Sequence, residues 1–174
     1  MRAPHVITEA ELDGAPWVAC GQAALAALFD RPLAQVRPAC PRRRRPWMNL
    51  ADMMVGAVAM GGSATVYRCS VEGALEERRY PEHGFALVQF CGPWDKNLRE
   101  SLKRSHWIAV RRAPEGSPFQ SMVFDVNSVG SKSALVVGGW QGLQVWEAVM
   151  PPTLAEEIPG ATGRWWIRAG VEVT

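Results

Sequence analysis

The sequence predicts an α+β fold in which N-terminal helices pack on a mostly antiparallel sheet. Two apolar segments rich in Ala, Leu and Met come first, and residues that end helices follow each of them. From about residue 64 onward the chain changes to short segments rich in β-branched and aromatic residues, which favour strands. Helices followed by strands are typical of this class, and 174 residues suit one domain, which we expect to span residues 1–174.

The first predicted helix runs from Val18 to Phe29, with Cys20 in its first turn. It is expected to end before the following proline, because the residue that precedes a proline is disfavoured in the helical region. The second predicted helix runs from about Leu50 to Met60, with Asn49 as its N-cap and two glycines after its last turn. Its methionines are expected to fill gaps in the core.

Six strands are expected in the remainder of the chain. They are Ala64–Cys69, Gly84–Cys91, His106–Arg112, Met122–Asn127, Leu143–Val149 and Gly163–Val173. Two polar stretches that permit short helices, Val71–Arg79 and Lys96–Arg104, interrupt them. Because only a loop containing Pro and Gly joins the third strand to the fourth, we expect these two to be antiparallel neighbours. The start of the third strand would then lie beside the end of the fourth.

Composition and charge exclude several functional classes. The net charge is +2, with 48% hydrophobic and 21% charged residues, which gives no general case for nucleic-acid or membrane binding. The run Arg42–Arg45 has no aromatic residues interleaved with it and is interpreted as a solvated loop. The sequence has neither a signal-peptide pattern nor an apolar run long enough to span a membrane, so we expect a cytoplasmic location.

The four cysteines, at positions 20, 40, 69 and 91, form no Cys-x-x-Cys pair, and the chain has only three histidines. We therefore expect free thiols, no metal site and no cofactor. Of the four, only Cys20 begins a helix, where the positive end of the helix dipole lowers the pKa of a thiol. Cys20 is thus the candidate nucleophile, although cysteines in helices of small residues are often only buried core residues.

His106 is the candidate base because it begins a predicted strand and can be held rigidly there, whereas His5 and His83 lie in a leading segment and a predicted turn. Asp125 and Asn127 lie at the end of the neighbouring predicted strand, on one face of it. Either side chain could accept the imidazole N–H and fix its tautomer. Spacing does not separate these two candidates, and the same residues also favour a plain turn.

The order Cys, His, Asx resembles that of the papain-like cysteine peptidases. More narrowly, Cys20-Gly21-Gln22, the segment 106–111 and Val126-Asn127-Ser128 resemble the Josephin-type deubiquitinating peptidases. The same Cys-Gly pair, with a His strand followed by an Asp strand, is similar to the bacteriocin-leader peptidases of ABC transporters. The resemblance covers roughly residues 15–130 and rests on short motifs.

This resemblance implies a papain-like fold and hydrolysis of peptide or isopeptide bonds in a protein or peptide substrate. It implies Cys20 as the nucleophile and His106 as the base, with Asn127 orienting the base in the Josephin pattern and Asp125 in the leader-peptidase pattern. These families also place a glutamine shortly before the nucleophile as an oxyanion donor, and residues 11–19 contain none. Gln22, which follows the nucleophile, is the remaining candidate, and losing such a donor costs about 100-fold to 1000-fold in turnover.

The chain contains eight tryptophans. Trp17 and Trp107 flank the proposed site and are predicted to contact an extended peptide substrate. Four others lie in the C-terminal region and predict a surface for a homo-oligomer or an assembly partner. These are Trp140, Trp146, Trp165 and Trp166. Together with the missing glutamine they motivate an alternative function, a weakly active or inactive domain that serves as an interaction or structural subunit of a larger assembly such as a viral particle.

Overall fold

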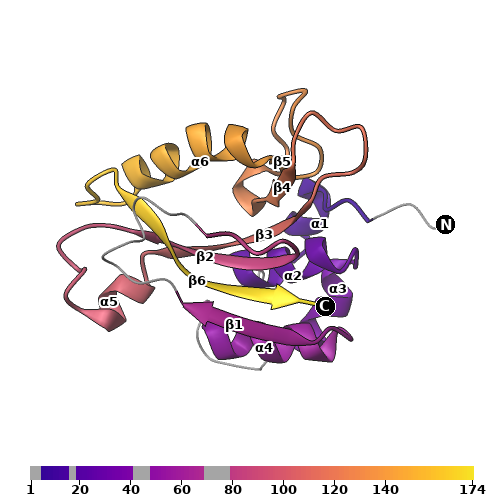
Figure 1. The fold of residues 1–174 in the computed structure, drawn as a ribbon, viewed down its shortest axis with the longest axis horizontal. Coiled ribbons are helices and arrows are strands. Elements are labelled where there is room, and N and C mark those ends of the chain that lie inside the picture. Colours follow the sequence, from indigo (N-terminus) through magenta and orange to yellow (C-terminus); the bar gives the residue numbers. More distant parts are fainter. Residues whose placement is uncertain (1–4, 16–18, 41–47, 69–78) are drawn as a thin grey trace.

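The computed structural model describes residues 5–15, 19–40, 48–68 and 79–174. These residues form a six-stranded antiparallel sheet with helices on both faces (Figure 1), which confirms the predicted α+β class. The strands are β1 Ala64–Arg68, β2 Gly84–Phe90, β3 Ser105–Arg112, β4 Ser121–Phe124, β5 Trp140–Gly142 and β6 Trp165–Val173. The strand order is β1-β6-β2-β3-β4-β5, so the last strand lies between the first and the second.

Among the described helices α2, α4 and α6 are the longest, and the others have five residues or fewer. The α-helices are α1 Glu9–Asp13, α2 Cys20–Leu28, α3 Leu33–Val36, α4 Leu50–Ala59, α5 Leu98–Leu102 and α6 Leu143–Glu157. The 3-10 turns are η1 Arg37–Ala39 and η2 Val126–Ser128. The two predicted N-terminal helices are present as α2 and α4. Asn49 caps α4 as predicted, because its side chain accepts the N–H of Asp52 while the Asp52 carboxylate accepts the N–H of Asn49.

Two hydrophobic cores lie on the two faces of the sheet. All seven residues of β2 are buried, and they alternate between the cores. Phe85 and Leu87 face the core shared with α2 and α4, while Ala86 and Val88 face the core shared with α6. Figure 1 shows α2 and α4 on one side of the sheet and α6 on the other. The central strands are therefore sandwiched between helices, which fixes their ends firmly in place.

Small side chains allow α2 to approach the sheet closely. Ala23, Ala24, Ala26 and Ala27 are all buried, and α2 packs on β3. A side chain at Gly21 would press on Met48 and Met53, so a larger residue directly after Cys20 would require these methionines to move. This close packing holds the first turn of α2 against the start of β3.

β3 and β4 are antiparallel neighbours, as predicted, with Ala109 opposite Phe124. The predicted fourth strand, however, ends three residues too late. The Asp125 side chain accepts the N–H of Asn127, so that Asp125 caps η2 and the strand ends at Phe124. Aspartate favours this local contact over a continued strand. Asp125 and Asn127 therefore do not share the face of a strand.

The strand predicted at Leu143–Val149 is wrong, because these residues form the first half of α6. A short apolar run does not by itself distinguish a buried strand from a buried helix, and prolines at 151 and 152 disfavour a helix that passes through them. The helix nevertheless continues through both prolines to Glu157.

Of the two polar stretches predicted to permit short helices, Lys96–Arg104 contains α5. Most of the other stretch, Val71–Arg79, falls in the segment 69–78, which lies outside the described residues. Cys69 and Arg42–Arg45 also lie outside the described residues.

The C-terminal tryptophans lie in the interior of the protein. Their exposed fractions do not exceed 7% for any of Trp140, Trp146, Trp165 and Trp166. The prediction of an assembly surface from these four side chains is therefore wrong, because their large apolar rings are buried in the core. Trp146 and Trp165 pack edge to face, with ring centroids 5.5 Å apart.

Among the described residues, no helix is both long enough and apolar enough to span a membrane.

Candidate active site

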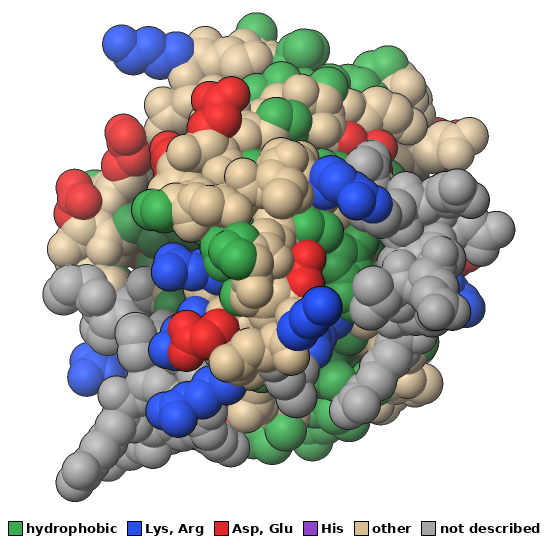
Figure 2. All heavy atoms as spheres, turned by 90° about the vertical axis from the view of Figure 1, so that its left-hand side faces the viewer, with side chains coloured by type: hydrophobic (Ala, Val, Ile, Leu, Met, Phe, Trp, Pro, Cys, Tyr) green, Lys and Arg blue, Asp and Glu red, His purple; other side chains and the backbone are tan. Residues whose placement is uncertain are grey.

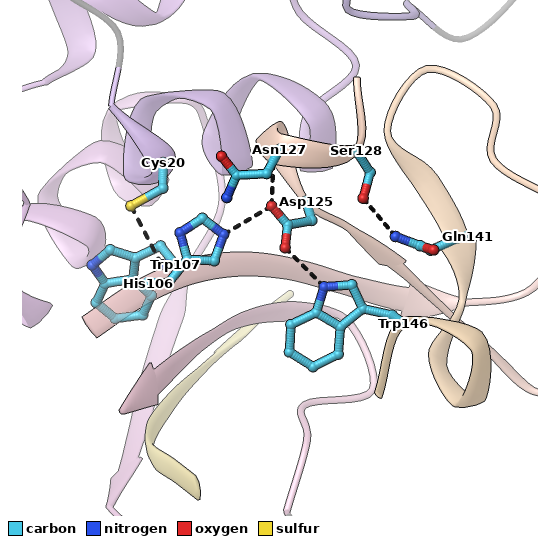
Figure 3. Close-up of polar contacts among 8 residues, drawn as sticks. All are labelled: Cys20, His106, Trp107, Asp125, Asn127, Ser128, Gln141 and Trp146. Carbon is cyan, nitrogen blue, oxygen red and sulfur yellow. Dashed lines mark hydrogen bonds and ion pairs between the residues drawn. The ribbon is translucent and has the colours of Figure 1, made fainter. Parts of the chain in front are cut away.

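Cys20 is the first residue of α2, and its side chain points toward the start of β3. The backbone N–H of Trp107 donates to Cys20 Sγ over 3.4 Å, which joins the helix to the strand (Figure 3). Ala19 is the N-cap, so the N–H groups of the first three helical residues have no acceptor inside the helix. Cys20 as a whole residue is half-buried. Its thiol thus lies at the positive end of a nine-residue helix.

His106 lies between Cys20 and Asp125. Its Nε2 donates to Asp125 Oδ1 over 2.9 Å, and the other ring nitrogen, Nδ1, faces Cys20 (Figure 3). The position of His106 at the start of β3, opposite Val88 of β2, keeps its backbone rigid. Only 11% of the His106 side chain is exposed, so the imidazole is largely shielded from water. The contact with Asp125 leaves Nδ1 to exchange a proton with the thiol.

Asp125 is fully buried, and its carboxylate is saturated with donors. Oδ1 accepts from His106 Nε2 and from the backbone N–H of Asn127, each over 2.9 Å. Oδ2 accepts from the indole Nε1 of Trp146 over 2.8 Å. A buried carboxylate remains ionised only when donors of this kind replace its lost hydration. The arrangement therefore stabilises a negative charge directly behind the imidazole.

The pKa values of the three residues shift in the directions that an ion pair requires. Burial raises the pKa of the Cys20 thiol, but the charge of His106 and a hydrogen bond with it outweigh burial and lower the pKa below the ordinary 9.0. Burial lowers the pKa of His106, yet Asp125 and Cys20 together raise it well above 6.5. Burial likewise raises the pKa of Asp125, and His106 and Trp146 reverse that effect. These directions favour a thiolate beside an imidazolium and an ionised carboxylate over the neutral forms of the same groups.

The other described cysteines show the opposite behaviour. Burial and the nearby charge of Asp52 raise the pKa of Cys40 to about 11. Burial and the charge of Asp95 raise the pKa of Cys91 as well. Cys20 is therefore the one described cysteine whose pKa is lowered, and the cause is its contact with an imidazolium.

The structure brings together Cys20, His106 and Asp125, three of the predicted site residues. Asn127 is exposed and contributes its backbone N–H to Asp125, while no hydrogen bond from its side chain to the imidazole occurs in the described part of the chain. Of the two candidates that spacing left open, Asp125 is the one that contacts His106. Gln22 completes the cap of its own helix, with its Oε1 accepting the N–H of Ala19 over 3.0 Å.

The predicted peptide contact of Trp107 is not available. Its side chain is only 2% exposed and its Nε1 donates to the carbonyl of Met48 over 2.8 Å, so it belongs to the core. Successive residues of β3 point to opposite faces, which sends Trp107 toward the core and His106 toward the other face. Trp17, the other tryptophan predicted to contact substrate, lies outside the described residues.

Sequence reasoning missed Trp146. This residue follows Asp125 by 21 positions and was assigned to a strand and to an assembly surface, whereas α6 carries its indole to the carboxylate. A signal was available, because a buried tryptophan usually finds an acceptor for its N–H. A second buried contact supports the same region, since Gln141 donates to Ser128 Oγ over 2.7 Å (Figure 3). This bond ties η2, and with it Asp125, to β5.

No protein-family model matches this chain, and no curated protein matches it either. Within residues 5–15, 19–40, 48–68 and 79–174, no group of three or more His, Cys, Asp and Glu side chains is arranged to hold a metal ion. The hydrogen-bonded group of Cys20, His106 and Asp125 is therefore the chemical feature on which a function can be based.

Proposed function

We propose that the protein is a papain-like cysteine peptidase or isopeptidase that hydrolyses peptide or isopeptide bonds. The observation that carries this proposal is the continuous chain of contacts from the Cys20 thiol through the His106 imidazole to the buried Asp125 carboxylate. A thiol nucleophile, an adjacent base and a third group that orients the base form the general arrangement of nucleophilic acyl transfer. The lowered pKa of Cys20 supports the same assignment.

The reaction divides into two steps. The Cys20 thiolate attacks the carbonyl carbon of the scissile bond, and His106 donates its Nδ1 proton to the departing amine, which leaves a thioester on Sγ. The neutral imidazole then takes a proton from water, whose oxygen attacks the thioester. The products are a carboxylic acid and the free thiolate, with the imidazolium regenerated. Asp125 holds the imidazole in one orientation in both steps and stabilises its positive charge whenever it is protonated.

Backbone N–H groups at the start of α2 are proposed to stabilise the oxyanion. The N–H of Cys20 has no acceptor within its helix, and it lies on the same residue as the attacking sulfur. Gln22, the other candidate, has its side-chain oxygen in the helix cap. With fewer side-chain donors than the resembling families have, turnover is expected to be about 100-fold to 1000-fold lower than with a complete oxyanion hole.

Alkylation of the folded protein tests the activation of Cys20. Iodoacetamide should modify Cys20 at pH 6 at least tenfold faster than Cys91, because a lowered pKa preserves the thiolate while a raised pKa removes it. The His106→Gln variant, which keeps a donor for Asp125, should lose most of this difference. Peptide mapping by mass spectrometry assigns each modified residue.

Hydrolysis itself is measured on a peptide mixture by mass spectrometry, with the Cys20→Ala variant as the control. Cleavage by the wild-type chain that is absent from the variant supports the peptidase. If Cys20 is alkylated no faster than Cys91 and no peptide is cleaved, the proposal is wrong. The structural or interaction subunit would then be the better assignment.

A further inference from the structure

A cavity of about 240 Å³ lies directly beside His106. It is bounded by the end of β2, the first residues of β3 and the C-terminal end of α6. His106 contributes to its wall, whereas Cys20 does not. The cavity therefore adjoins the proposed site on the side of the base, and not on the side of the sulfur.

The position next to His106 indicates which part of a substrate the cavity would receive. In the proposed reaction the acyl group becomes attached to Cys20 Sγ, while the amine departs with a proton from the imidazole. The residue that carries this amine must therefore lie near His106 at the moment of proton transfer. A cavity bounded by His106 but not by Cys20 lies on this leaving-group side.

The lining of the cavity is part apolar and part charged. Phe90, Leu154 and Ile158 supply apolar surface, and the charged side chains include Lys103 and Glu157. Lys103 is already paired, because its Nζ lies 2.7 Å from Glu100 Oε1. The side of the molecule with α5 and the end of α6 shows basic side chains with acidic ones close beside them (Figure 2). The charged lining residues therefore have no strong preference for one sign of charge, and the surface of Phe90, Leu154 and Ile158 favours an apolar occupant.

The volume limits the size of the occupant. Sites for whole small molecules usually measure about 300–1000 Å³, so this cavity suits a single side chain. Arg104 also lines the cavity, and its guanidinium lies 5.6 Å from the ring centre of Trp94. Given the proposed peptidase function, we propose that the cavity binds the apolar side chain of the substrate residue directly after the scissile bond.

The experiment digests a peptide mixture and determines the residue that follows each cleaved bond. The wild-type chain should cleave bonds followed by Leu, Ile, Met or Phe about tenfold or more faster than bonds followed by Gly or Asp. The Ile158→Trp variant fills the cavity and should abolish this preference, so that bonds followed by an apolar residue are cleaved no faster than bonds followed by Gly. The Leu154→Ala variant enlarges the cavity and should shift the preference toward Phe and Trp.

Val149→Trp is the matched control, because Val149 lies on the same helix, is 53% exposed and does not line the cavity. This variant should keep the wild-type preference. Cleavage that does not depend on the following residue, or that is unchanged in Ile158→Trp, overturns the inference about the cavity while the peptidase function stands. Absence of Cys20-dependent cleavage at any bond overturns both.

Discussion

Replacing Trp146 with phenylalanine tests whether the indole stabilises the ionised form of Asp125. The indole Nε1 donates to Asp125 Oδ2 over 2.8 Å, and both residues are fully buried. Phenylalanine fills much of the same space but has no N–H. The variant therefore leaves a buried carboxylate oxygen without its donor, in a place that water does not reach.

The size of the effect follows from this geometry. A hydrogen bond to a charged group contributes about 1.5–3 kcal/mol to stability, and its loss in a buried site falls at the upper end of this range. The smaller ring adds a packing loss, which the control must remove. Because donation by Trp146 helps to hold the pKa of Asp125 below 3.8, the variant should raise that pKa toward its ordinary value.

The free energy of unfolding is measured with urea, followed by circular dichroism, at several pH values. Trp166→Phe is the control, because Trp166 is 7% exposed and its indole has no hydrogen-bond partner among the described residues. At about pH 7 Trp146→Phe should cost about 1.5–3 kcal/mol more than Trp166→Phe. This extra cost should shrink as the pH falls through the folded pKa of Asp125, since the protonated carboxyl does not need the donor.

Two results would refute this reasoning. Equal losses in the two variants at about pH 7 would mean that the indole contributes only packing. An extra loss in Trp146→Phe that stays the same after the Asp125 carboxyl has become protonated in the folded protein would mean that the hydrogen bond does not act through the charge of Asp125.

The remaining predictions concern the site, the helix cap and the sheet. Asp125→Asn should slow alkylation of the Cys20 thiol at pH 6 about tenfold, because the His106 imidazolium loses its counter-charge. A tenfold change corresponds to one pKa unit, or about 1.4 kcal/mol. In the control Asn127→Ala, which keeps the backbone donor to Asp125, the alkylation rate should stay within about twofold of the wild-type rate. Gln22→Ala should cost about 0.5–1.5 kcal/mol in urea unfolding, because the N–H of Ala19 loses its acceptor, and an unchanged midpoint would contradict this role. Gly84→Ala should lower the free energy of unfolding by more than about 3 kcal/mol, because the added methyl collides with the carbonyl oxygen of Val171 in the neighbouring strand. A variant with the melting temperature of the wild-type chain would contradict this prediction and show that the two strands can separate locally.

Local features of the sequence identified the elements that carry the proposed nucleophile and base. The Ala-rich segment around Cys20 and the strand that begins near His106 are both visible from residue type and periodicity, because each depends on neighbouring residues. The antiparallel pairing of β3 with β4 also followed, since a short loop joins them. These local signals place Cys20 and His106 at the ends of elements, where they can meet.

Other features depended on contacts between distant parts of the chain. Leu143–Val149 forms a helix that places Trp146 in the core on one face of the sheet, a contact that no short window of sequence contains. The C-terminal tryptophans are core residues for the same reason. An abundance of aromatic residues indicates that large apolar surface exists, but only the packing of helices on the sheet determines whether it is covered.

By itself the sequence determined the α+β class, the thiol at the start of a helix and the histidine at the start of a strand. Only the tertiary structure decided that Asp125, and not Asn127, accepts from His106, and that Trp146 completes the shell of donors around Asp125. The physical reason is that propensity and periodicity act over a few residues. A buried charge, by contrast, is stabilised by donors from η2, β3 and α6, and folding alone brings these elements together.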